Sequence, residues 1–127
     1  MGRNIMVVDD EPQIRKMYSL AFQGAGYSVE CADSAEASIE MLKNSPASVF
    51  FLDLNLPGID GVSLCKAIHT QRPMSVIYAV TGYASLFELW ECREAGFEDY
   101  FIKPVRLSIL IEAAEHAFKK QHRWRKR

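Results

Sequence analysis

Short apolar runs alternate with segments of helical periodicity five times along this chain of 127 residues. An uninterrupted apolar run is typical of a strand covered on both faces, and apolar residues three or four positions apart are typical of a helix packed on a sheet. The runs interpreted as strands are residues 5–8, 27–31, 48–52, 75–80 and 99–102. The segments interpreted as helices are residues 13–22, 34–44, 62–69 and 85–95, with a last helix from residue 108 onward.

Strand and helix alternate without a long linker, which predicts an α/β fold: a doubly wound, five-stranded parallel sheet with five helices. Ser34 is expected to cap the second helix, and Pro46 prevents that helix from continuing. Parallel strands need crossover helices, which are almost always right-handed, so the carboxyl ends of all the strands lie at one edge of the sheet. Ligands of such folds bind at that edge, so the residues that follow the strands are the candidate functional residues.

Three carboxylates, a hydroxyl and an ammonium group are expected at this edge. They belong to Asp9, Asp10, Asp53, Thr81 and Lys103. Carboxylates held close together repel one another unless a cation lies among them, and oxygen ligands at an open edge suit Mg²⁺. The sequence therefore predicts a Mg²⁺ site, with Thr81 and Lys103 placed to neutralise the oxygens of a phosphoryl group.

A carboxylate at this edge can also act as the nucleophile that accepts the phosphoryl group. Asp53 stands alone after a buried strand, whereas Asp9 and Asp10 are adjacent and suit the binding of a metal. Position in the sequence leaves the choice of nucleophile open.

Four motifs in this order resemble those of the response-regulator receiver domain, the phosphoacceptor module of two-component signalling. They are Val-Val-Asp-Asp-Glu at 7–11, Phe-Leu-Asp-Leu-Asn-Leu-Pro-Gly-Ile-Asp-Gly at 51–61, Val-Thr-Gly at 80–82 and Asp-Tyr-Phe-Ile-Lys-Pro at 99–104. The resemblance extends from residue 5 to about residue 118. It implies a flavodoxin-like receiver fold over residues 1–118 that accepts and loses its own phosphoryl group and turns over no external substrate.

The resemblance also implies roles at the acidic edge. Asp53 is expected to accept the phosphoryl group from a sensor histidine kinase or a phosphotransfer protein. Mg²⁺ is expected to be bound by Asp10, by Asp9 through water, by Asp53 and by the backbone carbonyl of Asn55. Tyr83, two residues after Thr81, is expected to shield the acyl phosphate from water.

A second group of implied roles concerns the response to phosphorylation. Thr81 is expected to follow the phosphoryl group and Lys103 to pair with it, with a cis bond between Lys103 and Pro104. Tyr100 is expected to turn inward when Thr81 moves. The face formed by the fourth helix, the fifth strand and the fifth helix would then be read by a target protein or by a second copy of the chain. Apolar residues of the fourth helix cover an arc wider than one packed stripe and are expected to contribute to this face: Leu86, Phe87, Leu89 and Trp90.

The charge of the chain is divided unevenly. Residues 1–118 hold nine Lys or Arg against sixteen Asp or Glu, and residues 119–127 hold six Lys or Arg and no acid. An acidic body repels phosphate backbones, so nucleic-acid binding by the domain itself is not expected. The basic end is interpreted as an extension of the last helix, as the start of a linker, or as a contact for nucleic acid or an acidic partner with Trp124 as a stacking element.

The cysteines and the first apolar run point to a cytoplasmic location. Cys31, Cys65 and Cys92 form no Cys-x-x-Cys motif and are interpreted as reduced, buried thiols. The run at residues 5–8 is too short for the core of a signal peptide or for a membrane span. A membrane partner is therefore not expected.

Three other functions fit parts of the pattern. A phosphohydrolase with an aspartyl intermediate commonly has a second acid two residues after the nucleophile, and this chain has Asn55 there. A flavodoxin-like nucleotide or flavin module would need a glycine-rich loop after the first strand, where this chain has Asp9, Asp10 and Glu11. A receiver used as a passive dimerisation or scaffold module would not need the complete set of acidic, hydroxyl and lysine residues.

Overall fold

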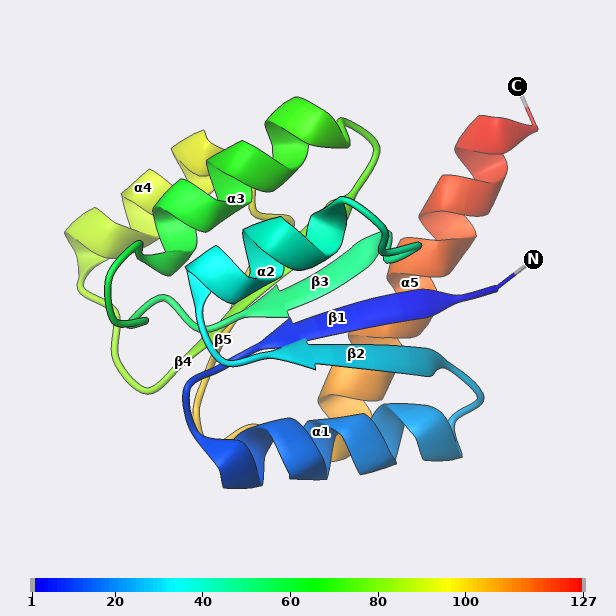
Figure 1. Cartoon of the computed structure of the whole chain (residues 1–127), viewed down its shortest axis with the longest axis horizontal. Coiled ribbons are helices and arrows are strands. Elements are labelled where there is room, and N and C mark those ends of the chain that lie inside the picture. Colours follow the sequence, from blue (N-terminus) through cyan, green and yellow to red (C-terminus); the bar gives the residue numbers. More distant parts are fainter. Residues whose placement is uncertain (1, 127) are drawn as a thin grey trace.

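A computed structural model describes residues 2–126 and contains one sheet of five parallel strands in the order β2-β1-β3-β4-β5 (Figure 1). The strands are β1 (Asn4–Val8), β2 (Ser28–Ala32), β3 (Val49–Leu52), β4 (Val76–Thr81) and β5 (Asp99–Ile102). The helices are α1 (Pro12–Gly24), α2 (Ala35–Leu42), α3 (Gly61–Gln71), α4 (Leu86–Ala95) and α5 (Leu107–Arg125). The predicted doubly wound α/β fold is confirmed.

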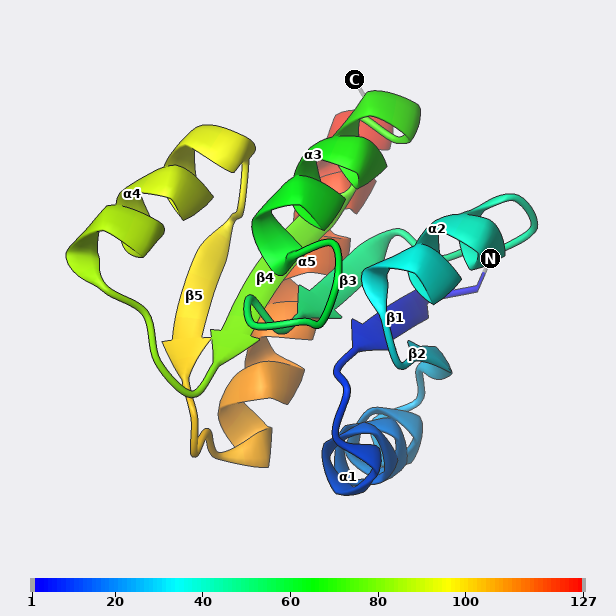
Figure 2. The same ribbon diagram turned by 60° about the vertical axis from the view of Figure 1, so that its left-hand side comes forward.

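The helices cover both faces of the sheet. α1 and α5 lie on one face, and α2, α3 and α4 lie on the other (Figures 1 and 2). Along β3, Phe51 packs with the α1 and α5 side, and its neighbour Phe50 packs with the α2 and α3 side. This alternation follows from the two-residue period of a strand, and it explains why the central strands are apolar throughout.

The core on the α1 and α5 side contains a row of aromatic rings. The ring centroids of Phe22 and Phe51 are 4.8 Å apart, and those of Phe51 and Tyr78 are 5.1 Å apart. Each of these residues is at most 4% exposed. The row joins α1 to β3 and β4, the strands at whose carboxyl ends Asp53 and Thr81 lie.

Polar side chains cap α2, α3 and α4 near the carboxyl edge, whereas the starts of α1 and α5 have no side-chain cap. Ser34 accepts a hydrogen bond from the backbone N–H of Ala37, which confirms it as the cap of α2. Asp60 caps α3 in the same way, and Ser85 forms a reciprocal capping box with Glu88 at α4. These caps set where the loops before α2, α3 and α4 end.

Some details differ from the sequence prediction. Thr81 is the last residue of β4 and does not follow it, and Cys31 is only half-buried, whereas Cys65 and Cys92 are buried. Residues 119–125 belong to α5, and the domain boundary at residue 118 stays a prediction. Within residues 2–126, no helix has the length and apolar character needed to cross a membrane.

Candidate functional site

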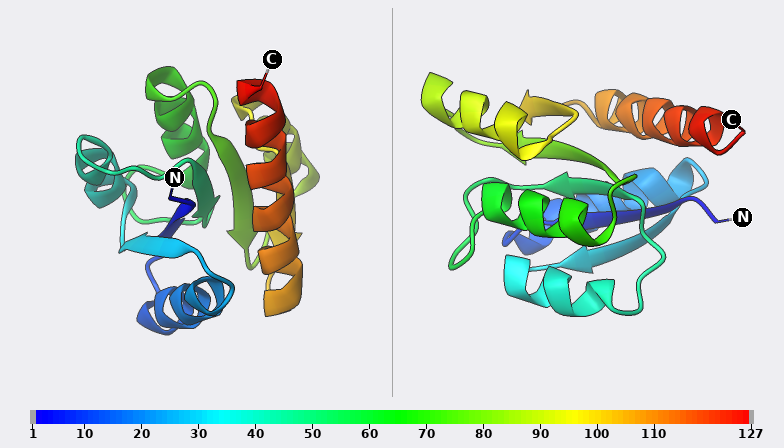
Figure 3. Two further views of the ribbon diagram at one scale, coloured as in Figure 1. Left: turned by 90° about the vertical axis from the view of Figure 1, so that its right-hand side faces the viewer. Right: turned by 90° about the horizontal axis from the view of Figure 1, so that it is seen from above.

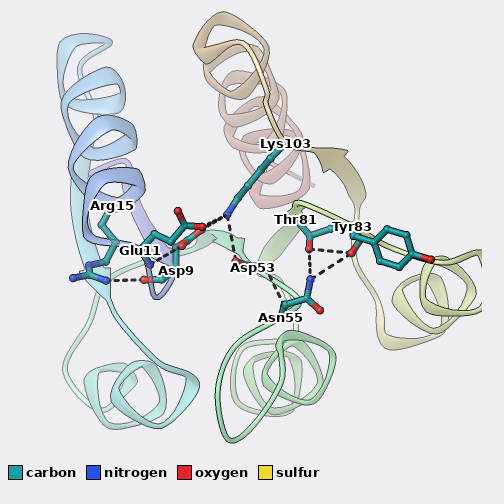
Figure 4. A network of polar contacts seen from close by, with 8 residues as sticks. All are labelled: Asp9, Glu11, Arg15, Asp53, Asn55, Thr81, Tyr83 and Lys103. Atoms are coloured by element: carbon teal, nitrogen blue, oxygen red, sulfur yellow. Dashed lines mark hydrogen bonds and ion pairs between the residues drawn. The ribbon is translucent and has the colours of Figure 1, made fainter.

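The carboxyl edge of the sheet brings together all five predicted residues, with Asp10 next to Asp9. Asp9 follows β1, Asp53 follows β3, Thr81 ends β4 and Lys103 follows β5. The Lys103 Nζ lies 2.7 Å from Asp9 Oδ2 and 3.3 Å from Asp53 Oδ2, and 3.8 Å from Glu11 Oε1 (Figure 4). One ammonium group therefore joins carboxylates that are far apart in the sequence.

Backbone hydrogen bonds extend the sheet to include these residues. The Asp53 N–H donates to the Val8 carbonyl at 2.9 Å, and the Lys103 N–H donates to the Thr81 carbonyl at 2.8 Å. The Asp9 N–H donates to Ala32 at 3.2 Å. Because the sheet itself holds these residues, their side chains start from fixed positions.

The loop from β1 to α1 holds Asp9 from two sides. The Glu11 N–H donates to Asp9 Oδ1 at 2.9 Å, and the Arg15 Nη1 donates to the Asp9 carbonyl at 2.9 Å. The sequence motifs do not predict this contact of Arg15, because it depends on how the first turn of α1 is oriented toward the loop. Asp9 thus has one carboxylate oxygen held by the backbone and the other held by Lys103.

Asp53 is held in a similar way, and its loop also reaches Thr81. The Asn55 N–H donates to Asp53 Oδ1 at 3.0 Å, and the Asn55 side-chain amide donates to Thr81 Oγ1 at 2.9 Å. The Thr81 hydroxyl donates to the Tyr83 carbonyl at 3.3 Å. In this state the Thr81 hydroxyl is bound to neighbours beside the acidic cluster (Figure 4).

A glycine is required where α3 meets this loop. A Cβ built on Gly61 would lie 2.3 Å from the Asp53 carbonyl oxygen and 2.8 Å from the Leu54 Cα. Neither backbone atom can move without shifting the Asp53 peptide. The start of α3 therefore packs against the backbone of Asp53 at a distance that only glycine allows.

The pKa values of Asp9 and Lys103 are both raised, for different reasons. Asp9 and Asp53 are 2% and 6% exposed. Burial raises the pKa of Asp9 above its ordinary value of 3.8, although the hydrogen bond from Lys103 opposes this. Burial alone would lower the pKa of Lys103, but the hydrogen bond to Asp9 and the charge of Asp53 raise it above 10.5. The pKa of Asp9 thus rises chiefly through burial, and that of Lys103 rises through its contacts with Asp9 and Asp53.

Asp9, Asp10 and Asp53 can offer one carboxylate oxygen each, and these three oxygens lie within 4.8 Å of one another. Asp10 is exposed, so one side of the cluster is open to solvent. Hard oxygen donors with room for water ligands are what Mg²⁺ requires. The residues therefore fit the predicted ion, whose charge would lie among three neighbouring carboxylates.

Tyr83 and Tyr100 are both exposed, by 69% and 44%. The Tyr83 carbonyl faces Thr81 and Asn55, but its ring points away from Asp53, so the ring does not cover the acidic cluster as expected (Figure 4). A tyrosine on an exposed loop is free of packing that would hold its ring inward. Tyr100 pairs with Ala79 across β5 and β4, and its inward turn stays a prediction.

The bond between Lys103 and Pro104 is cis, as predicted. Apolar side chains of α4 are exposed: Leu86 by 86%, Phe87 by 70% and Trp90 by 62%. Leu89 is half-buried. A groove of about 360 Å³ lies between α4 and β5 beside these residues and Tyr100.

The fold, the acidic cluster and the lysine after β5 define a receiver domain, and comparison with known proteins agrees. The family model of the response regulator receiver domain matches residues 5–115. The chain belongs to the response regulator receiver family. Receiver domains are signalling modules of two-component systems; they are phosphorylated by histidine kinases and bind Mg²⁺ at an acidic pocket.

Individual relatives give the extent of the similarity. The response regulator FleR of Pseudomonas aeruginosa is 30% identical over 118 residues, which cover 92% of this chain and 25% of FleR. The regulatory protein AtoC of Escherichia coli is 28% identical over 117 residues, again 92% of this chain and 25% of AtoC. The chain thus spans about a quarter of the length of these curated relatives.

Solved structures match over nearly the whole chain. A CheY-like response regulator receiver domain protein from Methanospirillum hungatei has a TM-score of 0.93 and 29% identity, and the match covers 97% of this chain and 98% of that one. The DrrB receiver domain in a BeF3-activated form has a TM-score of 0.86 and 27% identity, with 94% and 99% covered.

Proposed function

We propose that this domain is a phosphoacceptor switch in which Asp53 receives a phosphoryl group from a phosphohistidine of a sensor kinase or phosphotransfer protein. The observation that carries the proposal is the Lys103 ammonium group lying 3.3 Å from Asp53 Oδ2 and 2.7 Å from Asp9 Oδ2. It places a cation where the equatorial oxygens of a phosphoryl group on Asp53 would lie. The domain spans residues 1–118 in this proposal, and residues 119–127 extend it.

The transfer is a displacement at phosphorus. An Asp53 carboxylate oxygen forms the new O–P bond as the N–P bond to the histidine breaks, and the electron pair of that bond returns to the imidazole. Lys103 stays near the acyl phosphate, and Asp9 and Asp10 keep their oxygens directed to the metal site. Bound Mg²⁺ would supply positive charge against the phosphoryl oxygens.

Asn55 and Thr81 link the transfer to the rest of the domain. A phosphoryl group on Asp53 offers the Thr81 hydroxyl a charged acceptor in place of the Tyr83 carbonyl, to which it now donates at 3.3 Å. Thr81 turning to the phosphoryl group leaves space beside β4 into which Tyr100 turns. The face of α4, β5 and α5 then changes its shape for a target or for a second copy of the chain.

Membership of the family supports a histidine kinase as the partner and the cytoplasm as the location. The histidine-protein kinase BarA of Shigella flexneri contains a segment 32% identical to this chain over 108 residues. A receiver segment within a kinase is in keeping with phosphoryl transfer between histidine and aspartate. We place the protein in the cytoplasm, where a kinase and Mg²⁺ are both available.

The domain turns over no external substrate in this proposal. The match with the cyclic di-GMP phosphodiesterase of Thermotoga maritima covers only 31% of that protein, so it does not assign the phosphodiesterase activity to this chain. A passive scaffold remains the second candidate, because the apolar residues of α4 are exposed. It differs in needing no phosphoryl group on Asp53.

Intact-mass spectrometry tests the proposal directly. The protein is incubated with acetyl phosphate, with and without Mg²⁺, beside Asp53→Asn and the control variant Asp33→Asn. Asp33 is an exposed residue that follows β2 at the same edge of the sheet. We expect one phosphoryl adduct that requires Mg²⁺, persists in Asp33→Asn and is lost in Asp53→Asn. An adduct that persists in Asp53→Asn would contradict the proposal, and a folded chain without any adduct would favour the scaffold.

A further inference from the structure

A second charged site lies at the amino edge of the sheet, opposite the acidic cluster. The amino end of β1 and the carboxyl end of α5 lie at the same end of the molecule (Figure 3). They border a cleft of about 540 Å³. Its lining residues include the cations Arg3, Lys119, Arg123 and Arg125. Glu115 is the only carboxylate of residues 2–126 that lines the cleft.

Most of this positive charge is not neutralised by carboxylates of residues 2–126. Lys119 pairs with Glu115 at 3.2 Å. Within residues 2–126, no carboxylate lies within ion-pair distance of Arg3, Arg123 or Arg125. Guanidinium groups bind carboxylates through two parallel hydrogen bonds and are less strongly hydrated than ammonium groups. Three guanidinium groups are therefore available to one anionic ligand.

The cleft is attached to a rigid part of the fold. Gln121 of α5 is 5% exposed. Its amide donates to the carbonyls of Ser48 at 2.9 Å and Met74 at 3.1 Å, and its side-chain oxygen accepts from the Ser48 hydroxyl at 3.1 Å. One turn earlier, Phe118 stacks on Tyr27 with centroids 5.2 Å apart. The arginines thus stand on a helix that is fixed to the amino ends of β3 and β4.

We propose that this cleft binds an acidic segment, rich in Asp or Glu, of a partner protein. The argument is charge complementarity together with concave shape: an extended peptide fits such a cleft, whereas duplex DNA is read by an element that protrudes into its groove. Residues 1–118 also carry sixteen acids against nine Lys or Arg. A long phosphate backbone would meet that repulsion, and a short acidic peptide confined to the cleft would not.

The position of Trp124 also favours a peptide over single-stranded nucleic acid. Stacking of bases on aromatic rings supplies much of the binding to single strands. Trp124 lines a different hollow of about 270 Å³, with Met74 and Pro73, and does not line the basic cleft. The described lining of the cleft contains no tryptophan, and its aromatic side chains are the exposed His122 and the half-buried Phe118, whose ring is already stacked on Tyr27.

The two charged sites can act at the same time. All five strands run in the same direction (Figure 1). The acidic cluster lies at their carboxyl ends, and the basic cleft lies at the amino-edge side of the sheet. An acidic peptide in the cleft would leave Asp53 accessible. The proposal goes beyond the phosphoacceptor function and does not depend on it.

Fluorescence anisotropy with the full chain tests the proposal. The probes are a labelled peptide of alternating Glu and Gly, the same peptide with Gln in place of Glu, and a single-stranded oligothymidylate of equal charge. The test variant is Arg3→Gln with Arg123→Gln and Arg125→Gln. The matched control removes three exposed cations elsewhere: Lys16→Gln, Lys43→Gln and Lys66→Gln.

We expect the Glu peptide to bind and the Gln peptide not to bind. The test variant should weaken binding by about tenfold or more, as three exposed charge pairs together would contribute, and the control should weaken it far less. A second variant, Arg123→Glu with Arg125→Glu, should bind a Lys-containing peptide in its place. Tighter binding of the oligothymidylate, no binding of the Glu peptide, or an equal loss in the control would each overturn the proposal.

Discussion

The two edges of the sheet carry opposite charges and hold them in different ways. At the carboxyl edge, Asp9 and Asp53 are almost fully buried and share one ammonium group, that of Lys103. At the amino edge, Arg3 and Arg123 are exposed and have no carboxylate partner within residues 2–126. Water screens the second group of charges but hardly reaches the first.

This difference separates a site for chemistry from a site for binding. Buried like charges change their pKa values and attract a cation or a phosphoryl group, because water cannot compensate them. Exposed like charges cost the fold little and act mainly on what approaches the surface. The carboxyl edge should therefore respond to Mg²⁺ and pH, and the amino edge should respond to salt.

The largest expected effect comes from removing the shared cation. Lys103→Met leaves Asp9 and Asp53 close together without their ammonium partner. We expect the free energy of unfolding at neutral pH, without Mg²⁺, to fall by about 3 kcal/mol, the cost typical of an unpaired buried charge. Denaturant unfolding with and without Mg²⁺ measures this, and Mg²⁺ should restore part of the loss.

The matched control for Lys103 lies at the amino edge. Lys119→Met breaks the ion pair with Glu115, whose side chains are 65% and 52% exposed. The loss should stay below about 1 kcal/mol and should not depend on Mg²⁺. Equal losses in the two variants would mean that the two edges do not differ as described.

A smaller effect is expected from pH. The pKa of Asp9 is raised above 3.8 by burial, so above that value the folded state holds its proton longer than the unfolded state does. Without Mg²⁺, the contribution of Asp9 to stability should become less favourable as the pH rises from about 3.8 through the higher folded pKa. Comparing denaturant unfolding of the native chain and Asp9→Asn across this range isolates the contribution. A difference that is constant with pH would show that burial does not govern Asp9.

The smallest effect concerns the arginines of the basic cleft. Arg123→Ala removes an exposed side chain that holds no other part of the fold, so the free energy of unfolding should change by less than about 0.5 kcal/mol. Thermal unfolding at low and high salt measures this change. A loss of several kcal/mol would mean that the arginine supports the fold and is not reserved for a ligand.

The alternation of strands and helices, and the residues at the strand ends, could be predicted from the sequence for a physical reason. A parallel sheet places the carboxyl end of every strand at one edge. The backbone therefore brings Lys103 and Asp9 to the same edge, where the Lys103 side chain contacts Asp9. Residues 99–102 were expected as a strand and form β5. Other helix and strand ends moved by a few residues, because capping contacts decide them.

Features that depend on side-chain direction and long-range packing could not be predicted in this way. The Arg15 contact with the Asp9 carbonyl requires a particular orientation of the first turn of α1. The outward ring of Tyr83 is a choice of rotamer on an exposed loop (Figure 4). The basic cleft is lined by residues from both ends of the chain, Arg3 and the last turns of α5, and the sequence alone left several interpretations of the basic end open.

The central claim is that Asp53 carries the phosphoryl group, and chemical trapping tests it most directly. After phosphorylation with Mg²⁺ and acetyl phosphate, borohydride reduces an aspartyl phosphate to homoserine, and peptide mass spectrometry identifies the residue changed. We predict homoserine at position 53 alone, and none after omission of Mg²⁺. Homoserine at Asp9 or Asp10, with Asp53 unchanged, would contradict the account.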